Sequence, residues 1–337
     1  MKKRILYIGN ALSRKDATQT TIDILARLFR EEGYSVHTSS RMNNKVFRML
    51  DMLWTTMLNS RKTDVVLIDT YSTANFWYAV LIGALCQILN KPYIPILHGG
   101  NLPSRIKNSP KASKFLFKKA MVNIAPSHFL LSEFKKVGFT NLSFIPNTLE
   151  ITKYSFLDRK AVTPKLLWVR SFSSIYNPIM ALQVLEALLK EYPKASLTMV
   201  GPAKDESYDE CVAFAKAQKL TVTFTGLLAK EEWVALASLH DIFISTTNFD
   251  NTPVSVIEAM ALGLPIVSTD VGGMPFLIDH NKDGILTPAR EVAPFVASLK
   301  NILQSPELAQ SLAQNARKKA ESFDWNTVKK SWEEVLS

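Results

Sequence analysis

The chain has 337 residues, of which 47% are hydrophobic, with 12 glycines and 16 prolines. This composition is that of an ordinary folded protein and excludes a disordered chain, and the length predicts about two domains. The formal net charge of +10 is concentrated in the first half, because residues 1–160 hold 24 Lys and Arg against 10 Asp and Glu. We therefore expect an anionic partner on this half, although no nucleic-acid motif accompanies the charge.

The two cysteines and the N-terminal segment bear on the cell compartment. Cys86 and Cys211 fall in different predicted domains, and neither has the spacing of a metal site or of a disulfide framework. The N-terminal MKKRILYIGN starts basic, but its apolar run ends at Gly9-Asn10, so we expect a first strand and not a signal peptide. These features predict a cytoplasmic protein. The basic first half adds peripheral association with the inner face of the membrane as an option.

Short apolar strands and amphipathic helices alternate through the first half. The first strand is followed by a loop, but no GxGxxG is present, which disfavours a hydride-transfer enzyme. Polar and glycine-containing segments separate the elements. The expected strands are Arg4–Gly9, Val36–Ser39, Asp64–Asp69, Tyr93–His98, Met121–Ala125 and Leu142–Pro146, and the expected helices include Thr18–Glu32, Asn43–Asn59, Phe76–Leu89 and Pro126–Val137.

Three segments of this half are rich in apolar residues, and two of them also carry basic residues. We interpret Asn43–Asn59 as a core-facing helix with its charges in water; a basic amphipathic helix at a membrane surface is the alternative. Phe76–Leu89 is nearly all apolar but too short to span a bilayer, which predicts a buried helix. Residues 105–119 hold six basic residues around Phe115-Leu116-Phe117, which fits a solvated face and a surface near anionic lipid equally well.

His98 stands at the end of a predicted strand and is followed by Gly99-Gly100-Asn101. In an open α/β sheet, ligands gather beyond the carboxyl ends of the strands. A histidine there can donate a hydrogen bond to a hydroxyl or contact a diphosphate. We therefore place His98 in a ligand site, with a histidine satisfied by local backbone as the alternative.

The second half repeats the strand and helix alternation after a polar, irregular segment, Asn147–Pro164, which is the candidate linker. Repeated βα units with short apolar strands predict a parallel sheet covered on both faces. We expect domains at 1–150 and 160–321, with a last helix over 324–337. The expected strands are Lys165–Val169, Ser196–Val200, Leu220–Thr225 and Asp241–Ser245, and the expected helices are Ala181–Lys190, Tyr208–Gln218, Lys230–Ser238, Val292–Leu303 and Pro306–Glu321.

The stretch Asn248–Gly273, NFDNTPVSVIEAMALGLPIVSTDVGG, is the most informative part of the sequence. Thr252 suits an N-cap and Pro253 the first position of a helix. Such a helix start offers free backbone N–H groups and a positive dipole end to a phosphate. Asp250 precedes the helix and Glu258 lies inside it among apolar residues. A carboxylate there needs a partner, such as a sugar hydroxyl or a backbone N–H.

This stretch resembles the donor-site signature of the family 4 retaining glycosyltransferases, which have the GT-B fold. The family pattern is Glu-x7-Glu, a proline after the loop, an EAMA-like helix, G-x-P and a VGG turn. Here it appears as Asp250-x7-Glu258, Pro253, Glu258-Ala259-Met260-Ala261, Gly263-x-Pro265 and Val271-Gly272-Gly273. Asp250 replaces the first Glu, which keeps the charge but shortens its reach. A buried α/β turn whose Glu has a structural role is the alternative.

The resemblance implies an α/β fold of two Rossmann-like, doubly wound parallel-sheet domains that face a central cleft. The N-terminal domain would hold the acceptor, the C-terminal domain the nucleotide-sugar donor, and the final helix would pack back on the first domain. The implied roles are phosphate stabilisation for Arg170, ribose binding for Glu258 and sugar orientation for Asp250 and His98. The implied donor contacts also include Gly226, Leu227, Thr252, Pro253, Val254 and Ser255. Gly9 and Asn10 match a loop that approaches the donor phosphates or the acceptor in the family, with a simple tight turn as the alternative.

The sequence departs from the family at one cation. The family has a Lys about five residues after the Arg, whereas Ile175-Tyr176-Asn177-Pro178 stands here. A leaving diphosphate carries roughly two negative charges that cations and N–H groups must meet. Lys204, beyond another strand end, is our proposed substitute, with a solvent-exposed lysine as the alternative. Lys230 is expected at the surface.

The resulting prediction is a retaining, metal-independent hexosyltransferase that moves a sugar from a nucleotide-diphosphate sugar to a glycan or lipid-linked acceptor in cell-envelope polysaccharide or glycoconjugate synthesis. No metal or other cofactor is expected, because the sequence shows neither a metal-ligand cluster nor a DxD motif. A nucleotide-sugar epimerase or phosphorylase of the same fold is one alternative. A non-catalytic basic protein that binds nucleotide sugars at a membrane surface is the other.

Overall fold

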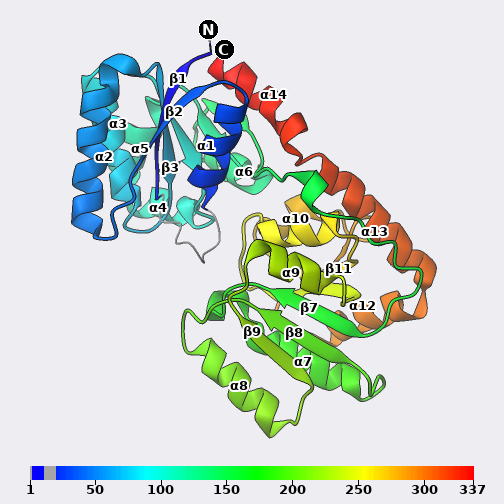
Figure 1. The fold of residues 1–337 in the computed structure, drawn as a ribbon. Helices are drawn as coiled ribbons and strands as arrows, with labels where there is room; N and C mark the ends of the chain where they lie inside the picture. The colour runs from blue at the N-terminus through cyan, green and yellow to red at the C-terminus, as the bar shows by residue number, and fades with distance from the viewer. Residues whose placement is uncertain (1, 11–19) are drawn as a thin grey trace. The chain divides into compact units, whose positions relative to one another are not determined.

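The computed structural model describes residues 2–10 and 20–337. The chain divides into two compact units, one formed by Met1–Pro146 with Val328–Ser337 and the other by Asn147–Thr327 (Figure 1). The last helix, α14 (Trp325–Leu336), starts in the second unit and has its remaining turns in the first. Cys86 and Cys211 are buried free thiols, one in each unit.

A six-stranded parallel sheet forms the centre of the first unit, in the order β2-β1-β3-β4-β5-β6. The chain moves across the sheet in one direction from β2 to β6, so right-handed crossovers place α2 to α6 on one face. The strands are β1 (Arg4–Ile8), β2 (Ser35–Ser39), β3 (Val65–Thr70), β4 (Tyr93–Leu97), β5 (Asn123–Ala125) and β6 (Leu142–Phe144). The helices are α1 (Thr21–Glu31), α2 (Lys45–Asn59), α3 (Phe76–Ile88), α4 (Leu102–Asn108), α5 (Pro110–Lys118) and α6 (His128–Lys136).

Each face of this sheet has its own apolar layer. Residues of α2 to α6, among them Met52, Phe76 and Phe117, form one buried cluster on their face. On the other face α1 meets the C-terminal part of α14, where the rings of Phe29 and Trp332 lie edge to face with centroids 5.3 Å apart. Figure 1 draws α1 and α14 together on that side. The C-terminal residues thus complete the cover of the first sheet.

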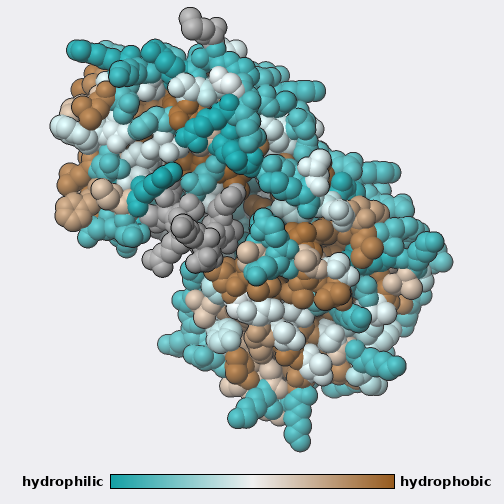
Figure 2. Space-filling view, in the orientation of Figure 1, coloured by the Kyte–Doolittle hydropathy of each residue, from teal (hydrophilic) through white to brown (hydrophobic). Residues whose placement is uncertain are grey.

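Helix α2 contradicts the prediction of a core-facing helix. Its buried residues are Arg48, Met52 and Thr56, and the large apolar residues around them face solvent. We call these exposed residues the α2 apolar face; they are Val46, Phe47, Leu50, Trp54, Met57 and Leu58, each between 45% and 62% exposed. Figure 2 shows hydrophobic side chains gathered over α2 at the left edge of the first unit. Apolar residues lie on nearly all sides of this helix, so packing one side against the unit leaves the others in water.

A second six-stranded parallel sheet, ordered β12-β11-β10-β7-β8-β9, forms the centre of the second unit. Separate buried clusters lie on its two faces. The strands are β7 (Lys165–Val169), β8 (Ser196–Val200), β9 (Val222–Gly226), β10 (Ile242–Ser245), β11 (Ile266–Thr269) and β12 (Ile285–Thr287). The helices are α7 (Pro178–Leu189), α8 (Ser207–Ala217), α9 (Lys230–Ala237), α10 (Val254–Ala261), α11 (Met274–Leu277), α12 (Val292–Gln304) and α13 (Pro306–Glu321).

The predicted α/β class with two parallel sheets is confirmed, and β12 and α11 are elements that the sequence did not predict. Helices of the described ranges all fall short of the length and apolar character needed to cross a bilayer. In the second unit, the carboxyl ends of β7, β8 and β10 bring Arg170, Gly201 and the loop before α10 to the same edge of the sheet. Ligand sites of open α/β sheets form at such an edge.

Candidate functional site

Helix α10 begins one residue later than predicted. Pro253 is the N-cap, with ψ of 122°, and Val254 is the first helical residue, so Thr252 lies outside the helix. The Pro253 carbonyl accepts hydrogen bonds from the N–H groups of Val256 and Ile257, at 3.1 and 3.4 Å. The N–H groups of Val254 and Ser255 precede the first intrahelical bond, as at every helix start. The positive end of the helix, with free donors, therefore lies at Val254 and Ser255.

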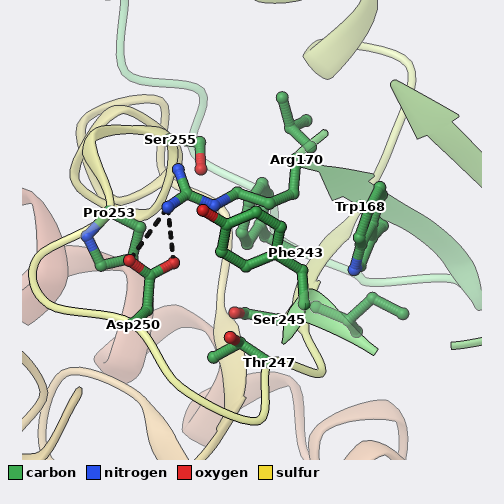
Figure 3. Close-up of a pocket in the computed structure, with 11 residues that line it drawn as sticks. Trp168, Arg170, Phe243, Ser245, Thr247, Asp250, Pro253 and Ser255 are labelled. Atoms are coloured by element: carbon green, nitrogen blue, oxygen red, sulfur yellow. Dashed lines mark hydrogen bonds and ion pairs between the residues drawn. The ribbon is translucent and has the colours of Figure 1, made fainter. Parts of the chain in front are cut away.

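Arg170 and Asp250 meet in front of this helix start. Nη2 of Arg170 lies 2.9 Å from Oδ1 and 2.8 Å from Oδ2 of Asp250 (Figure 3). The guanidinium also covers the ring of Tyr176, with its central carbon 4.3 Å from the ring centroid. Burial raises the pKa of Asp250, and the charge of Arg170 opposes that rise. Arg170 is thus fixed by a carboxylate on one side and an aromatic ring on another.

The loop that carries Asp250 is held by the Gly272-Gly273 turn. The N–H of Gly273 donates to the Asp250 carbonyl at 2.9 Å, and the N–H of Asn251 donates to the Asp250 carboxylate at 2.9 Å. A Cβ on Gly272 would lie 2.3 Å from the Asp250 carbonyl oxygen, and one on Gly273 would lie 1.8 Å from that of Asn251. Gly272 also has a φ of +55°. Only glycine lets the turn backbone come this close to the carbonyls of the Asp250 loop, which explains why two glycines stand at this turn.

A pocket opens beside the Arg170–Asp250 pair, between the ends of β7 and β10 and the start of α10. We call it the β7–α10 pocket. Its wall combines aromatic rings with hydroxyls, the mixture expected of a small-molecule site. The lining residues are Trp168, Val169, Arg170, Tyr176, Phe243, Ile244, Ser245, Thr247, Asp250, Pro253 and Ser255. Figure 3 shows Arg170 reaching from β7 toward the loop of Asp250 and Pro253.

Glu258 is buried within α10, where its side chain is 3% exposed. Its Oε1 accepts a hydrogen bond from the Tyr154 hydroxyl at 2.8 Å and pairs with the ammonium of Lys230. Burial raises the pKa of Glu258, while Lys230 and Tyr154 lower it. Lys230 was expected at the surface; its side chain is 35% exposed, but it also pairs with the buried carboxylate. Helix α9 begins at Lys230 and directs its side chain to the buried carboxylate, a contact between residues 28 positions apart.

The remaining predicted residues of the second unit lie at neighbouring strand ends. Gly226 ends β9 with a φ of +71° and accepts a hydrogen bond from the Gly201 N–H at 2.8 Å, and Leu227 beside it is 48% exposed. A Cβ on Gly201 would lie 1.9 Å from the carbonyl oxygen of Arg170. Lys204 is exposed, and its N–H donates to the carbonyl of Phe172, two residues after Arg170. Lys204 is thus anchored next to the Arg170 segment by its backbone.

Gly9, Asn10 and His98 belong to the first unit and form a separate group there. Nε2 of His98 lies 2.8 Å from Oδ1 of Asp69, a residue that the sequence analysis did not single out. Asp69 and His98 end adjacent parallel strands, since β3 and β4 pair in register up to Thr70 and Leu97. Both strand ends follow from the sequence, but only the strand order shows that they are neighbours.

Comparison with known proteins adds family information for the second unit. Residues 156–319 match the family described as glycosyl transferases group 1. Glycogen synthase of Mycobacterium tuberculosis is 26% identical over 196 residues, which are 57% of this chain and 47% of that protein. Spore coat protein SA of Bacillus subtilis is 27% identical over 172 residues, 48% of this chain and 46% of that protein. The chain thus spans about half the length of these two relatives.

One relative matches over a longer stretch. N,N'-diacetylbacillosaminyl-diphospho-undecaprenol alpha-1,3-N-acetylgalactosaminyltransferase of Campylobacter jejuni is 25% identical over 265 residues, 73% of this chain and 67% of that protein. This match is longer than the family stretch of residues 156–319.

Solved structures match almost the whole chain. HepE from Anabaena, crystallised with UDP and glucose, superimposes with a TM-score of 0.78 at 17% identity, covering 99% of both chains. Sucrose-phosphate synthase from Thermosynechococcus elongatus superimposes with a TM-score of 0.81 at 15% identity, covering 99% of this chain and 98% of that one. The chain therefore has the GT-B glycosyltransferase fold, and residues 156–319 of its second unit match the glycosyl transferases group 1 family.

Proposed function

We propose that the protein is a retaining, metal-independent glycosyltransferase of family 4 type that uses a nucleotide-diphosphate sugar. The observation that carries this proposal is the position of Arg170, which lies at the positive end of α10 in a pocket and is held there by Asp250. A guanidinium and free helix N–H groups are the donors that a diphosphate needs. The family match of the same unit and the UDP complexes of HepE support the donor class.

In this proposal the second unit binds the donor. The diphosphate lies between Arg170 and the N–H groups of Val254 and Ser255, with Thr252 and Pro253 shaping the loop before them. Lys204 adds a further positive charge from the neighbouring strand end. The turn at Gly226 and Leu227 contacts the nucleobase through backbone groups. These positions extend along the edge of the sheet at which β7, β8 and β9 end and α10 begins.

Glu258 holds the ribose in the proposed donor complex. A carboxylate accepts hydrogen bonds from two vicinal hydroxyls, and its burial in α10 gives it a fixed direction. Lys230 and Tyr154 already contact Oε1 of Glu258, so they orient the carboxylate. Residues 154 and 230 thus support the ribose contact without themselves being assigned to the ligand.

The proposed chemistry exchanges one bond at the anomeric carbon for another. The bond from the sugar C1 to the leaving phosphate oxygen breaks, and a bond from C1 to the acceptor oxygen forms on the same face. The acceptor proton passes to the leaving phosphate, so no protein nucleophile is required. Arg170 and the α10 start stabilise the developing negative charge on that phosphate, the role a divalent metal has in other enzymes. Asp250 orients the transferred sugar.

The acceptor is proposed to be a glycan or lipid-linked sugar, with the α2 apolar face resting on an anionic membrane surface. The exposed basic residues Arg41, Lys45, Arg61 and Lys62 lie at the two ends of α2. On helix α5 and its C-cap, Lys111, Lys114, Lys118 and Lys119 are exposed. Apolar insertion combined with neighbouring basic side chains is the pattern of an interfacial helix. The Campylobacter relative, by its name, acts on a diphospho-undecaprenol substrate, which supports a lipid-linked acceptor.

A panel of UDP-, GDP- and ADP-sugars tests the proposal on the whole chain. Release of the free nucleotide with formation of a glycosylated product supports transfer. Conversion of the donor to its C2 epimer without a glycosylated product supports an epimerase, and transfer to inorganic phosphate supports a phosphorylase. Saturable binding to anionic vesicles without affinity for any nucleotide supports a non-catalytic membrane-surface protein. Each of these last three results, if found in place of the first, overturns the transferase assignment.

A further inference from the structure

A second pocket lies in the first unit, at the carboxyl ends of β1 and β3. We call it the β1–β3 pocket. Its polar wall includes Asp69, the amides of Asn10 and Asn75, and the rings of Tyr71 and Tyr78. Gly9 lies directly beside the carboxylate. The position matches the ligand edge of an open parallel sheet, as the β7–α10 pocket does in the other unit.

Within the described part of the chain, Asp69 has one carboxylate oxygen occupied and one without a partner. Its side chain is 1% exposed. Oδ1 accepts from the Tyr7 hydroxyl and from Nε2 of His98, each at 2.8 Å. Oδ2 is buried and has no hydrogen-bond partner among residues 2–10 and 20–337. A buried acceptor without a donor is costly and uncommon, so this oxygen indicates a ligand that donates to it.

Gly9 keeps the space around that oxygen open. A Cβ at position 9 would lie 2.3 Å from Oδ2 and 2.8 Å from Cγ of Asp69, well inside van der Waals contact. The backbone of Gly9 does not take a left-handed conformation, so the close approach itself is what excludes a larger residue. Gly9 therefore borders the pocket at the unpaired oxygen.

The lining indicates the chemistry of the ligand. Oδ1 of Asn10 accepts from Nη1 of Arg48 at 3.1 Å, which directs the other end of the amide, a donor, away from Arg48. A carboxylate acceptor, an amide donor and tyrosine rings within one small pocket suit a polyol, whose hydroxyls donate and accept beside an apolar ring face. No group of three or more potential metal ligands occurs among the described residues.

We propose that the β1–β3 pocket binds a sugar, with Oδ2 of Asp69 accepting a hydrogen bond from one of its hydroxyls, and that this sugar belongs to the acceptor. Identifying the sugar as the acceptor rests on the proposed transferase function, in which the second unit binds the donor. Asp69 is a binding residue in this proposal. Its Oδ1, held by Tyr7 and His98, fixes the direction of Oδ2 toward the pocket.

Ligand-detected saturation-transfer NMR on the whole chain tests the binding step without using activity. The probes are the methyl α-glycosides of glucose, galactose and N-acetylglucosamine, each with and without UDP. Asp69→Asn keeps an acceptor for Tyr7 and His98 but replaces Oδ2 with a donor, and Gly9→Ala keeps the carboxylate while closing the space beside it. Asp64→Asn is the matched control, since Asp64 precedes β3 at its opposite end and pairs with Arg4 at the surface.

We expect at least one probe to receive saturation from the wild type and from Asp64→Asn, with an affinity that falls about tenfold or more in Asp69→Asn, as expected for losing a hydrogen bond to a charged group. Gly9→Ala should lower the affinity in the same direction. Circular dichroism and the melting temperature establish that each variant is folded. Absence of a signal from every probe with wild type, or a signal that Asp69→Asn leaves unchanged, overturns the proposal.

Turnover separates this inference from the proposed function. If the transferase assignment is right, Asp69→Asn should raise the acceptor KM while nucleotide release from the donor into water, without acceptor, stays within about twofold. An equal loss in both reactions would place Asp69 in donor binding or in stability and would overturn the acceptor assignment. If the wild type releases nucleotide from no donor and the sugar signal still depends on Asp69, the transferase function fails and the sugar site stands.

Discussion

Nη2 of Arg170 lies almost equidistant from the two carboxylate oxygens of Asp250, at 2.9 and 2.8 Å, although the residues are 80 positions apart. The pair joins the end of β7 to the loop before α10, so it sets where the guanidinium stands relative to the helix start. Asp250 is 8% exposed and the Arg170 side chain 30%, which leaves part of the guanidinium open to a ligand. A cation held in place before the ligand arrives stabilises developing charge without reorganisation.

The first prediction concerns this cation. Arg170→Ala should lower kcat/KM for the nucleotide sugar about 10²- to 10³-fold, because it removes a preorganised charge at the leaving phosphate. Arg170→Lys should retain part of the activity, since an ammonium keeps the charge but cannot reproduce the fixed fork of a guanidinium. Steady-state kinetics and calorimetric titration with UDP, GDP and ADP measure both effects.

The control for Arg170 is Lys216→Ala, which removes an exposed basic side chain on α8 of the same unit. Its kcat/KM and nucleotide Kd should equal those of the wild type. Equal losses in Lys216→Ala and Arg170→Ala would mean that the general positive charge of the unit, and not the position of Arg170, governs donor binding.

The second prediction concerns Glu258 and pH. Burial raises the pKa of this carboxyl above its ordinary 4.5, so the folded chain binds a proton that the unfolded chain has already lost. Stability therefore falls as pH rises through the interval between the unfolded and folded pKa values. Glu258→Gln removes this titration. The melting temperature of the variant minus that of the wild type should therefore become more positive as the pH is raised from below 4.5 to neutral. The same variant should lose nucleotide affinity, because the ribose contact is gone.

Lys230 provides the matched measurement for Glu258. Lys230→Ala leaves a buried carboxylate without its cation and should destabilise the fold by about 1–3 kcal/mol, a value discounted because Lys230 is partly exposed. On the Glu258→Gln background the same substitution should have a smaller effect. A Glu258→Gln protein that is less stable than the wild type at pH 7 but not at pH 4 would show instead that the ion pair is net stabilising.

The third prediction concerns Lys204, the proposed substitute for the lysine that the family has after its arginine. Lys204→Ala should raise the donor KM or lower kcat by about tenfold, as expected for one charge-assisted hydrogen bond. Lys204→Arg should retain most of the activity, because it keeps a cation at the same strand end. Unchanged donor KM and kcat in Lys204→Ala would remove this residue from the site.

The fourth prediction concerns the metal and the anomeric outcome. Transfer should continue at an unchanged rate after treatment with EDTA, because Arg170, Lys204 and the α10 start are proposed to meet the diphosphate charge. Proton NMR of the first product formed should show the same anomeric configuration as the donor. A rate that is abolished by EDTA and restored by a divalent cation contradicts the first statement, and an inverted product contradicts the second.

The sequence located all six strands of the first unit, because each is a short apolar run, but it missed β12 in the second unit. Around α10, glycines at positions 263, 272 and 273 mark turns where a Cβ would collide with backbone, so pattern and geometry coincide there. The start of α10 was misplaced by one residue because proline is compatible with both the N-cap and the first helical position; its ψ of 122° decides for the cap.

The missed contacts are those that depend on side chains from distant segments. Lys230 at the start of α9 carries no local signal that it reaches Glu258, and Asp69 lies at the end of an apolar strand whose neighbour can be named only once the strand order is known. Helix α2 shows a different limit. A helix with apolar residues on most sides fits a core and an interface equally, and only the fold decides which side faces inward.

The fifth prediction concerns this α2 apolar face. The whole protein should sediment with vesicles that contain anionic lipid at low salt and bind neutral vesicles less, since basic side chains near the surface contribute about 1 kcal/mol each. Raising the ionic strength should weaken the binding, because salt screens these charges beyond about 10 Å at 0.1 M.

Two substitutions separate insertion from charge. Trp54→Glu places a carboxylate on the exposed side of α2, where the indole is 60% exposed and makes little contribution to the core. It should reduce vesicle binding by about tenfold or more, since burying one large apolar side chain contributes roughly 1.5–3 kcal/mol. Leu239→Glu is the matched control, because Leu239 is 65% exposed in the other unit. Both variants should keep the wild-type melting temperature and turnover of soluble acceptors. Equal binding to neutral and anionic vesicles, or binding that Trp54→Glu does not change, would show that the α2 apolar face does not contact an anionic membrane and would direct attention to a protein partner for it.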